Sequence, residues 1–166
     1  MNPQYLADDL AVRSLANAYS HAVSRLDSDA AAMVYAEDGV LSAFRGPDIV
    51  GRAKICEAFH NTFDPLDFLI QTCAAGMVEI DGDRAKASWS VTEWFKPKGM
   101  DDLGCCFGMY EDQVVRTAEG WRFARRRFHP FYRGMVAVKG KGYLPPEAFG
   151  NDYAPWPFLG LESVKA

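Results

Sequence analysis

One carboxylate, Glu93, lies in an otherwise apolar run and is the residue whose position most suggests chemistry. Residues 79–95 read as two extended runs joined by a tight turn at 81–83. Side chains alternate along a strand, so Glu93 shares a face with Trp89 and Phe95. A charge among residues that are usually buried needs a partner or a catalytic role. Glu93 is therefore a candidate general base, with a pKa raised by desolvation, or half of an ion pair.

Two arginines supply the ion-pair alternative. Arg125 and Arg127 fall on the same strand phase as Trp121 and His129, so either could neutralise Glu93 without any catalysis. If Glu93 is instead the base, Arg127 is expected to hold an oxyanion that develops on the substrate, and Arg125 to bind substrate.

Histidines are the other candidate proton carriers. His129 ends the last predicted strand beside Tyr132, near an expected pocket mouth, and is either an acid or base or a hydrogen-bonded structural residue. His60 lies on the apolar stripe of a predicted helix, whereas His21 is expected to be solvated. The three histidines form no pair or carboxylate cluster with ligand spacing, so no metal is predicted. No phosphate or dinucleotide motif is present, so no cofactor is predicted either.

The elements that position these residues follow from hydrophobic periodicity. Helical spacing predicts helices at 8–26, 30–35 and 52–63, with a short strand at 40–44. The period then changes to two and predicts strands at 69–80, 84–95, 104–116 and 121–129, the first interrupted by a bulge at 74–76. Helices followed by an antiparallel meander indicate the α+β class.

Composition excludes several classes of function. The chain has 166 residues and a formal net charge of −4, which offers no basic surface for nucleic acid. No apolar run approaches the roughly 20 residues of a membrane span, and no signal peptide is visible. A cytoplasmic location is therefore predicted by default. The four cysteines form no Cys-x-x-Cys pair and are expected to stay reduced.

The C-terminal part differs from the rest in composition. We expect one domain over 1–135 and an aromatic, Gly- and Pro-rich extension over 136–166 that packs on the pocket mouth or on a neighbouring subunit. Trp94 on the outward phase adds apolar surface, so a homo-oligomer, either a dimer or a trimer, is predicted.

The order of motifs resembles the nuclear-transport-factor-2-like superfamily, in its SnoaL-like and scytalone-dehydratase-like branch. The segments that carry the resemblance are YSHAVSRLDSDAAAMVYAEDGVL, VGRAKICEAF, VEIDGDRAKASW and YEDQVVRTAEGWRFARRRF. The resemblance implies a cone: a curved antiparallel sheet wrapped around N-terminal helices, with an apolar pocket inside. The resemblance also implies one of two kinds of function: a cofactor-free dehydratase or isomerase, or a noncatalytic binding or assembly domain of the same fold.

The resemblance also identifies a departure. Dehydratase-like members carry a Tyr and an Asp on the first helix and a His on the first long strand. Tyr19 matches the tyrosine, but Ser24 and Gln71 occupy the other two positions, and neither can transfer a proton near neutral pH. Ser24 and Gln71 remain candidates for orienting a substrate.

Two hypotheses of function follow. The first is a cofactor-independent lyase or isomerase acting on a hydrophobic, aromatic or polycyclic small molecule, by dehydration or loss of a carbonyl fragment. Glu93 or His129 would remove the proton, and Tyr19 with Arg127 would stabilise the oxyanion. Trp89 and Phe59 are core residues or an aromatic wall for the ligand. The second hypothesis is a noncatalytic binding or assembly domain.

Overall fold

The computed structural model describes residues 2–42, 44 and 46–137, and predictions made for the rest of the extension lie outside these residues. The elements are α1 (Pro3–Ser24), α2 (Ser28–Met33), β1 (Tyr35–Ser42), β2 (Ile49–Val50), α3 (Arg52–Phe63), β3 (Leu66–Asp81), β4 (Arg84–Pro97), β5 (Leu103–Thr117) and β6 (Gly120–Val136). This order confirms the predicted α+β class.

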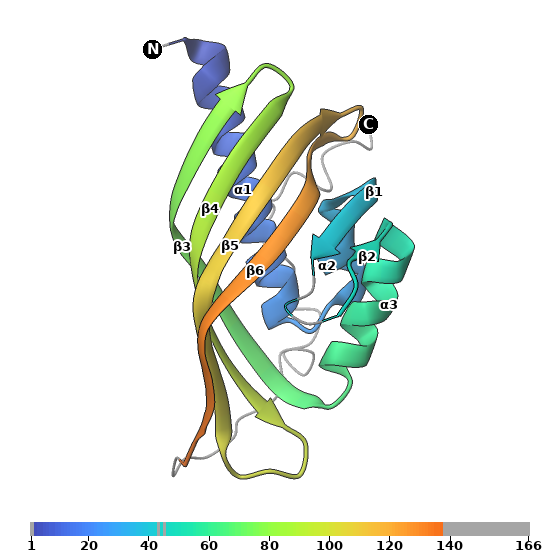
Figure 1. Cartoon of the computed structure of the whole chain (residues 1–166), viewed down its shortest axis with the longest axis vertical. Helices are drawn as coiled ribbons and strands as arrows, with labels where there is room; N and C mark the ends of the chain where they lie inside the picture. The colour runs from blue at the N-terminus through green and yellow to red at the C-terminus, as the bar shows by residue number, and fades with distance from the viewer. Residues whose placement is uncertain (1, 43, 45, 138–166) are drawn as a thin grey trace, which may run out of the picture.

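The strands form one curved sheet in the order β2-β1-β6-β5-β4-β3 (Figure 1). The meander from β3 to β6 is antiparallel, as predicted. β1 pairs with β6 in parallel, however, so the sheet is mixed rather than wholly antiparallel. A long connection through α3 and the meander separates these two strands, which permits parallel pairing.

The first two helices begin at capping side chains. Asn2 accepts a hydrogen bond from the Gln4 backbone N–H at 2.9 Å, and Pro3 opens α1, so this helix begins five residues before the predicted start. Asp27 caps α2 by accepting from the Ala30 N–H at 2.9 Å, so this helix begins two residues before the predicted start.

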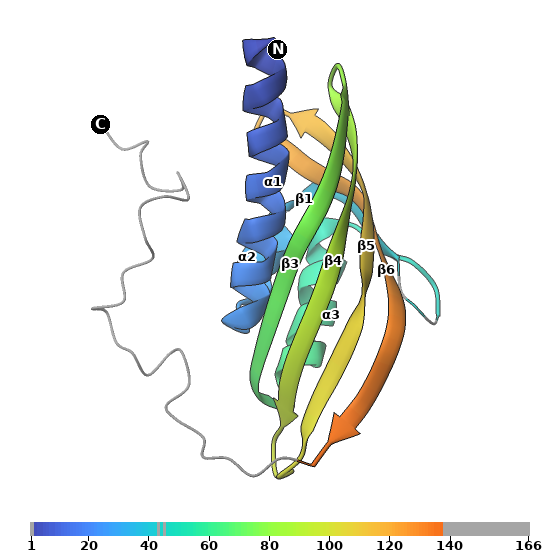
Figure 2. The same ribbon diagram turned by 90° about the vertical axis from the view of Figure 1, so that its left-hand side faces the viewer.

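The core lies between the helices and the concave face of the sheet, which we call the inner face. Figure 2 shows α1 along this side of the curved strands. The apolar stripe of α1 packs on inner-face aromatic residues and on α3; the largest buried members of this cluster are Tyr19, Tyr35, Phe59, Phe63, Trp89, Tyr110, Trp121 and Phe123. The helix and sheet pattern read from the sequence therefore forms a cone-shaped core.

A bulge bends β3 where the sequence predicts one. The pairing of β3 with β4 shifts between Ala74 and Met77. A Cβ atom on Gly76 would overlap the indole ring of Trp89, so only glycine allows the ring to lie against this strand. Arg13 of α1 donates to the Gly76 carbonyl at 2.9 Å and ties the bulge to the helix.

Gly76→Ala is therefore expected to destabilise the protein by about 1–3 kcal/mol, because the added methyl group displaces Trp89. Denaturant unfolding measures the change. Ala75→Gly is the matched control: Ala75 has a positive φ of 47°, which glycine adopts without strain, so at most about 1 kcal/mol is expected there. Equal losses in the two variants would contradict the role given to the Trp89 contact.

A second bulge, in β6, reverses which side chains of this strand point toward the core. The pairing of β5 with β6 shifts between Gln113 and Val114, because Ala124 has no partner on β5. Arg126, rather than its two neighbours, consequently points into the core, where it is fully buried.

Asp112 on β5 is the partner of this buried arginine. Its carboxylate accepts from Arg126 Nε at 2.8 Å and Nη2 at 2.7 Å, and from Trp89 Nε1 at 2.8 Å. The guanidinium lies over the rings of Tyr19, Tyr110 and Phe123 at 4.3, 4.1 and 3.9 Å. Burial alone would lower the pKa of Arg126, but the Asp112 carboxylate outweighs burial and raises it. The interior of the cone therefore contains a charged, hydrogen-bonded pair, in which Nη1 of Arg126 is buried without a hydrogen-bond partner among the described residues.

Candidate active site

Glu93 faces the inner side of β4 and is held by Gln71 of the neighbouring strand. The two residues are direct cross-strand partners, and Gln71 Nε2 donates to Glu93 Oε1 at 2.7 Å. Gln71 also donates to the Tyr110 hydroxyl at 3.2 Å and accepts from Ser20 Oγ at 3.1 Å. These partners fix the orientation of the Gln71 amide, so the amide presents N–H rather than C=O to the carboxylate. Gln71 is thus a positioning residue for Glu93.

The environment of Glu93 favours its protonated form. Burial raises the pKa of Glu93, and the Gln71 hydrogen bond and the positive charge of Arg133 offset part of this rise. Glu93 retains partial exposure, and among the described residues no hydrogen bond or ion pair within 4 Å reaches its second oxygen, Oε2. A half-buried carboxyl group with one free oxygen can take up and release a proton.

Arg133 is a site residue that the sequence reasoning missed. It lies opposite Cys106 on β5, which in turn lies opposite Glu93, so the three residues form one row across the inner face. Arg133 is exposed and its guanidinium lies 5.4 Å from the centre of the Phe95 ring. The row therefore joins a carboxylate to a solvent-accessible cation.

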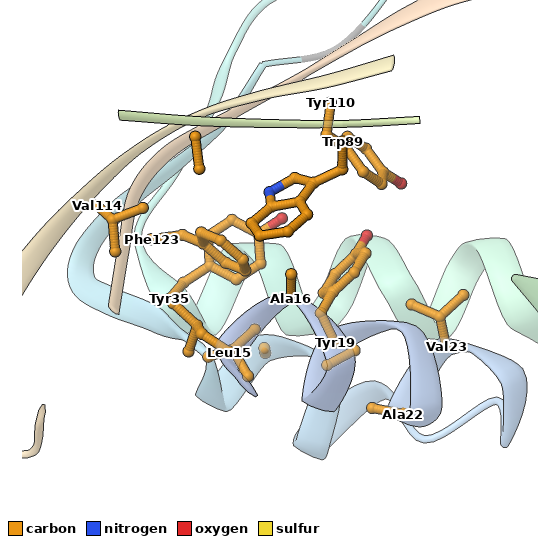
Figure 3. Close-up of a cluster of buried hydrophobic side chains, with 14 of the residues drawn as sticks. Leu15, Ala16, Tyr19, Ala22, Val23, Tyr35, Trp89, Tyr110, Val114 and Phe123 are labelled. Carbon is orange, nitrogen blue, oxygen red and sulfur yellow. The ribbon is translucent and has the colours of Figure 1, made fainter. Parts of the chain in front are cut away.

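Two tyrosines stand next to this row. Tyr19 of α1 and Tyr110 of β5 are buried and meet edge to face, with ring centres 5.8 Å apart (Figure 3). Burial raises the pKa of Tyr19 to about 12, although Arg126 and the Tyr110 hydroxyl oppose the rise. Burial also raises the pKa of Tyr110 well above its ordinary value. Both phenols are therefore protonated at neutral pH.

Ser24, at the position where the resemblance leads one to expect an acid, contacts backbone. Its hydroxyl accepts from the Gln71 N–H at 2.9 Å and lies 3.3 Å from the Gln71 carbonyl. Ser24 thereby satisfies the unpaired edge of β3 and holds this strand against α1.

Three residues expected on the inner face point outward instead, and this expectation was wrong. The Ala124 bulge shifts the phase of β6, so Arg125, Arg127 and His129 lie on the outer face of the sheet. Arg125 donates to Ser42 and Asp48, Arg127 is exposed, and His129 Nε2 lies 3.0 Å from Glu111 Oε2. The proposed ion pair between Glu93 and Arg125 or Arg127 is therefore absent from the described residues.

The other predicted site residues divide between core and surface. Trp89 and Phe59 are buried in the core, and Phe59 stacks on Phe63 at 5.5 Å. Tyr132 is exposed on the outer face and stacks on Phe107 at 6.0 Å. His60 is exposed on α3, away from the buried stripe expected to include it.

Two cavities lie away from Glu93. The larger, about 850 Å³, is at the hairpin end of the sheet and includes none of the predicted site residues; Arg52, Glu79, Arg84, Lys86 and Glu119 contribute to its wall. The smaller, about 280 Å³, includes His60. Arg52 and Glu119 pair at 2.9 Å in the larger cavity. We therefore place the candidate chemistry at Glu93, a desolvated acid whose Oε2 has no hydrogen-bond partner within residues 2–42, 44 and 46–137.

Glu93→Gln is expected to stabilise the fold increasingly as pH rises. Because the folded pKa of Glu93 is raised, the native state holds this proton more tightly, and stability is lost as pH rises from the unfolded pKa through the folded one. Glutamine removes that loss. Thermal unfolding of both proteins across this pH range measures it, with the exposed Glu79→Gln on β3 as the control for one lost charge. A difference that shrinks as pH rises would contradict the raised pKa.

A curved mixed sheet packed against three helices is the architecture of the nuclear-transport-factor-2-like superfamily. The SnoaL-like domain model matches residues 4–127, and the chain belongs to this family. The family resemblance read from the sequence is thereby confirmed. Curated protein sequences provide no match.

Solved structures from Novosphingobium share the fold. A provisionally assigned aromatic ring hydroxylase from Novosphingobium aromaticivorans is 27% identical, with a TM-score of 0.73 over 83% of this chain and 96% of the other. A provisionally assigned scytalone dehydratase from the same organism is 16% identical, with a TM-score of 0.75 over 89% and 98%. Hexachlorocyclohexane dehydrochlorinase LinA-type3 from Novosphingobium barchaimii is 15% identical, with a TM-score of 0.74 over 86% and 97%.

No described helix is long and apolar enough to cross a membrane.

Proposed function

We propose that this protein is a cofactor-independent lyase or isomerase in which Glu93 is the general base. The observation that carries the proposal is the half-buried carboxyl group, held by Gln71 at 2.7 Å, with a raised pKa and with no hydrogen-bond partner for Oε2 in the part of the chain that the structure describes. A carboxylate poised in this way removes a proton from carbon more effectively than a solvated one.

The surrounding groups suit an elimination or an isomerisation. Glu93 takes the proton from a carbon atom next to a carbonyl group, and the electron pair delocalises onto the carbonyl oxygen. Arg133 replaces Arg127 as the cation beside the developing oxyanion, and Tyr19 and Tyr110 are neutral phenols next to the same row. In a dehydration, the electron pair returns to form a carbon–carbon double bond, and the β-hydroxyl group takes the proton from Glu93 and leaves as water. In a retro-aldol cleavage, Glu93 instead removes the proton of the β-hydroxyl group, the carbon–carbon bond breaks, and the carbonyl fragment leaves while the bonding pair forms the enolate of the other fragment. In an isomerase, Glu93 returns the proton to another carbon atom.

The substrate class that fits is a hydrophobic, aromatic or polycyclic compound with a carbonyl or hydroxyl group. Apolar inner-face residues, Val91, Phe95 and Phe128, surround the row from Gln71 to Arg133. Two of the fold's relatives are named as a dehydratase and a dehydrochlorinase, and both names denote eliminations. The similarity supports this reaction class for the present chain without fixing a substrate.

A noncatalytic binding domain is the second candidate. The observation in its favour is that Ser24 and Gln71, at the positions of the usual acid and base, serve hydrogen bonds within the protein. Such a domain would bind the same class of ligand but would release it unchanged.

A ligand screen followed by an assay tests the proposal. Hydroxylated and carbonyl-containing aromatic compounds are screened by thermal shift, because a ligand stabilises the state that it binds. Compounds that raise the unfolding temperature are then incubated with the protein, and products are identified by mass spectrometry. Product formation supports the enzyme; binding of many compounds with no product supports the second candidate.

We also propose that the protein forms a cytoplasmic homo-oligomer. All four cysteines are free thiols, which suits a reducing compartment. Trp94 contacts Phe107 on the outer face, with ring centres 6.1 Å apart, and Tyr132 extends this aromatic surface. Light scattering coupled to size exclusion tests the assembly, and a species of 18.5 kDa alone would contradict it.

A further inference from the structure

Three metal-binding side chains meet between α2 and α3. Cys56 and His60 are four residues apart on α3, so they project from the same side of the helix. Asp29 comes from the first turn of α2, and Cys56 Sγ donates to its Oδ1 at 3.2 Å. One donor atom from each of the three residues lies within 4.8 Å of the others.

We propose that Asp29, Cys56 and His60 bind a zinc ion. Thiolate sulfur, imidazole nitrogen and carboxylate oxygen are the ligands that zinc takes in proteins, at roughly 2.0–2.3 Å from the metal. Donor atoms bound at those lengths in a tetrahedron lie about 3.3–3.8 Å apart. The observed group needs to contract by about 1 Å, and the exposed side chains of Asp29 and His60 can supply this movement by changing rotamer.

The charges of the three groups suit a divalent cation. Zinc displaces the thiol proton that now bonds to Asp29, so that a thiolate and a carboxylate together balance the two positive charges of the ion. His60 binds through a neutral ring nitrogen. No proton acceptor other than solvent is required.

The site has three protein ligands and space for a fourth. The cavity of about 280 Å³ has His60 in its wall, together with Ser28, the neighbour of Asp29 in the chain, so it adjoins the cluster at His60. A water molecule can enter the open position from this cavity. The arrangement therefore corresponds to an accessible zinc site with one exchangeable ligand rather than to a closed structural site.

Residues distant in the chain create this site, which explains why the sequence alone predicts no metal. Asp29 precedes Cys56 by 27 residues, and only the packing of α2 on α3 brings them together. A zinc ion held by both helices would stabilise the folded state, since the unfolded chain presents no preformed site.

Zinc titration of the full-length, tag-free protein after removal of metals by chelation tests the proposal. Calorimetry is expected to show one zinc ion per chain, and the thermal unfolding midpoint is expected to rise with zinc. Cobalt(II) replaces zinc as a spectroscopic probe, and a thiolate-to-cobalt charge-transfer band is expected in the near ultraviolet. Cys56→Ser and His60→Ala are each expected to weaken zinc binding at least tenfold, and Asp29→Asn less, since its amide oxygen can still contact the metal.

Cys73→Ser and His21→Ala are the matched controls, because they remove the same ligand types elsewhere in the chain. Both should bind zinc as the unmodified protein does. Circular dichroism confirms that each variant is folded, and the exposed Asp29 and His60 are the positions least prone to disturb folding. The proposal is overturned if the unmodified protein does not bind zinc, if the three site variants bind as tightly as it does, or if the charge-transfer band survives in Cys56→Ser.

Discussion

Replacing Glu93 by glutamine is expected to slow turnover by about 10²–10⁴-fold, the range that a positioned general base contributes. Glutamine has the shape of glutamate and can still accept from Gln71 Nε2, so the site retains its geometry. It cannot take up a proton. The measurement is the rate of product formation on the compound identified by the ligand screen, under saturating conditions.

Ligand binding separates loss of chemistry from loss of the site. The Glu93→Gln variant is expected to bind the compound as the unmodified protein does in a thermal-shift titration. Glu111→Gln is the control, because Glu111 is an exposed glutamate on the outer face of β5, beside His129. If Glu93→Gln retained full activity, or if Glu111→Gln slowed the reaction equally, Glu93 would not be the base.

Asp112→Ala is expected to destabilise the protein by about 3–5 kcal/mol, the largest effect of any single change on stability considered for this chain. The substitution leaves the Arg126 guanidinium buried without its two charged hydrogen bonds and leaves Trp89 Nε1 without an acceptor. Denaturant unfolding followed by circular dichroism measures the loss.

Two further variants test whether burial of the Asp112–Arg126 pair causes the large loss of stability in Asp112→Ala. Asp48→Ala removes the surface carboxylate that pairs with Arg125, and at most about 1 kcal/mol is expected there. The double variant Asp112→Leu/Arg126→Met replaces the buried pair by apolar side chains, so its loss should be smaller than that of Asp112→Ala alone. If Asp112→Ala cost no more than Asp48→Ala, the pair would not be the fixed interior contact described above.

The sequence was sufficient for most of the elements and for one site residue, whereas strand β2 was not predicted. Helix α3 has the predicted bounds, and the bulge at 74–76 is present, because hydrophobic period and small residues determine these features locally. Glu93 faces inward as predicted, since no register shift occurs along β4 between it and the turn at 81–83 that sets its phase.

Strand β6 shows where such reasoning fails. Alternation counted from Trp121 places Arg125, Arg127 and His129 inside, but one unpaired residue, Ala124, reverses the positions that follow it up to the next shift. Ala124 carries no signal of a bulge. A second shift near Pro130 returns Arg133 to the inner face, and a proline within a strand is a recognised signal for such a shift. The two shifts cancel, so alternation from Trp121, continued past the predicted end of the strand at His129, would have placed Arg133 on the inner face.

The most direct test of the central claim is the titration of Glu93 itself. Carbon-detected NMR follows the side-chain carboxyl carbon across pH, and the Glu93→Gln variant assigns the signal. We expect a pKa above that of an unperturbed glutamate, because the protein desolvates this carboxyl group. A pKa at or below the unperturbed value would show a solvated or ion-paired carboxylate, and would contradict the assignment of Glu93 as the base.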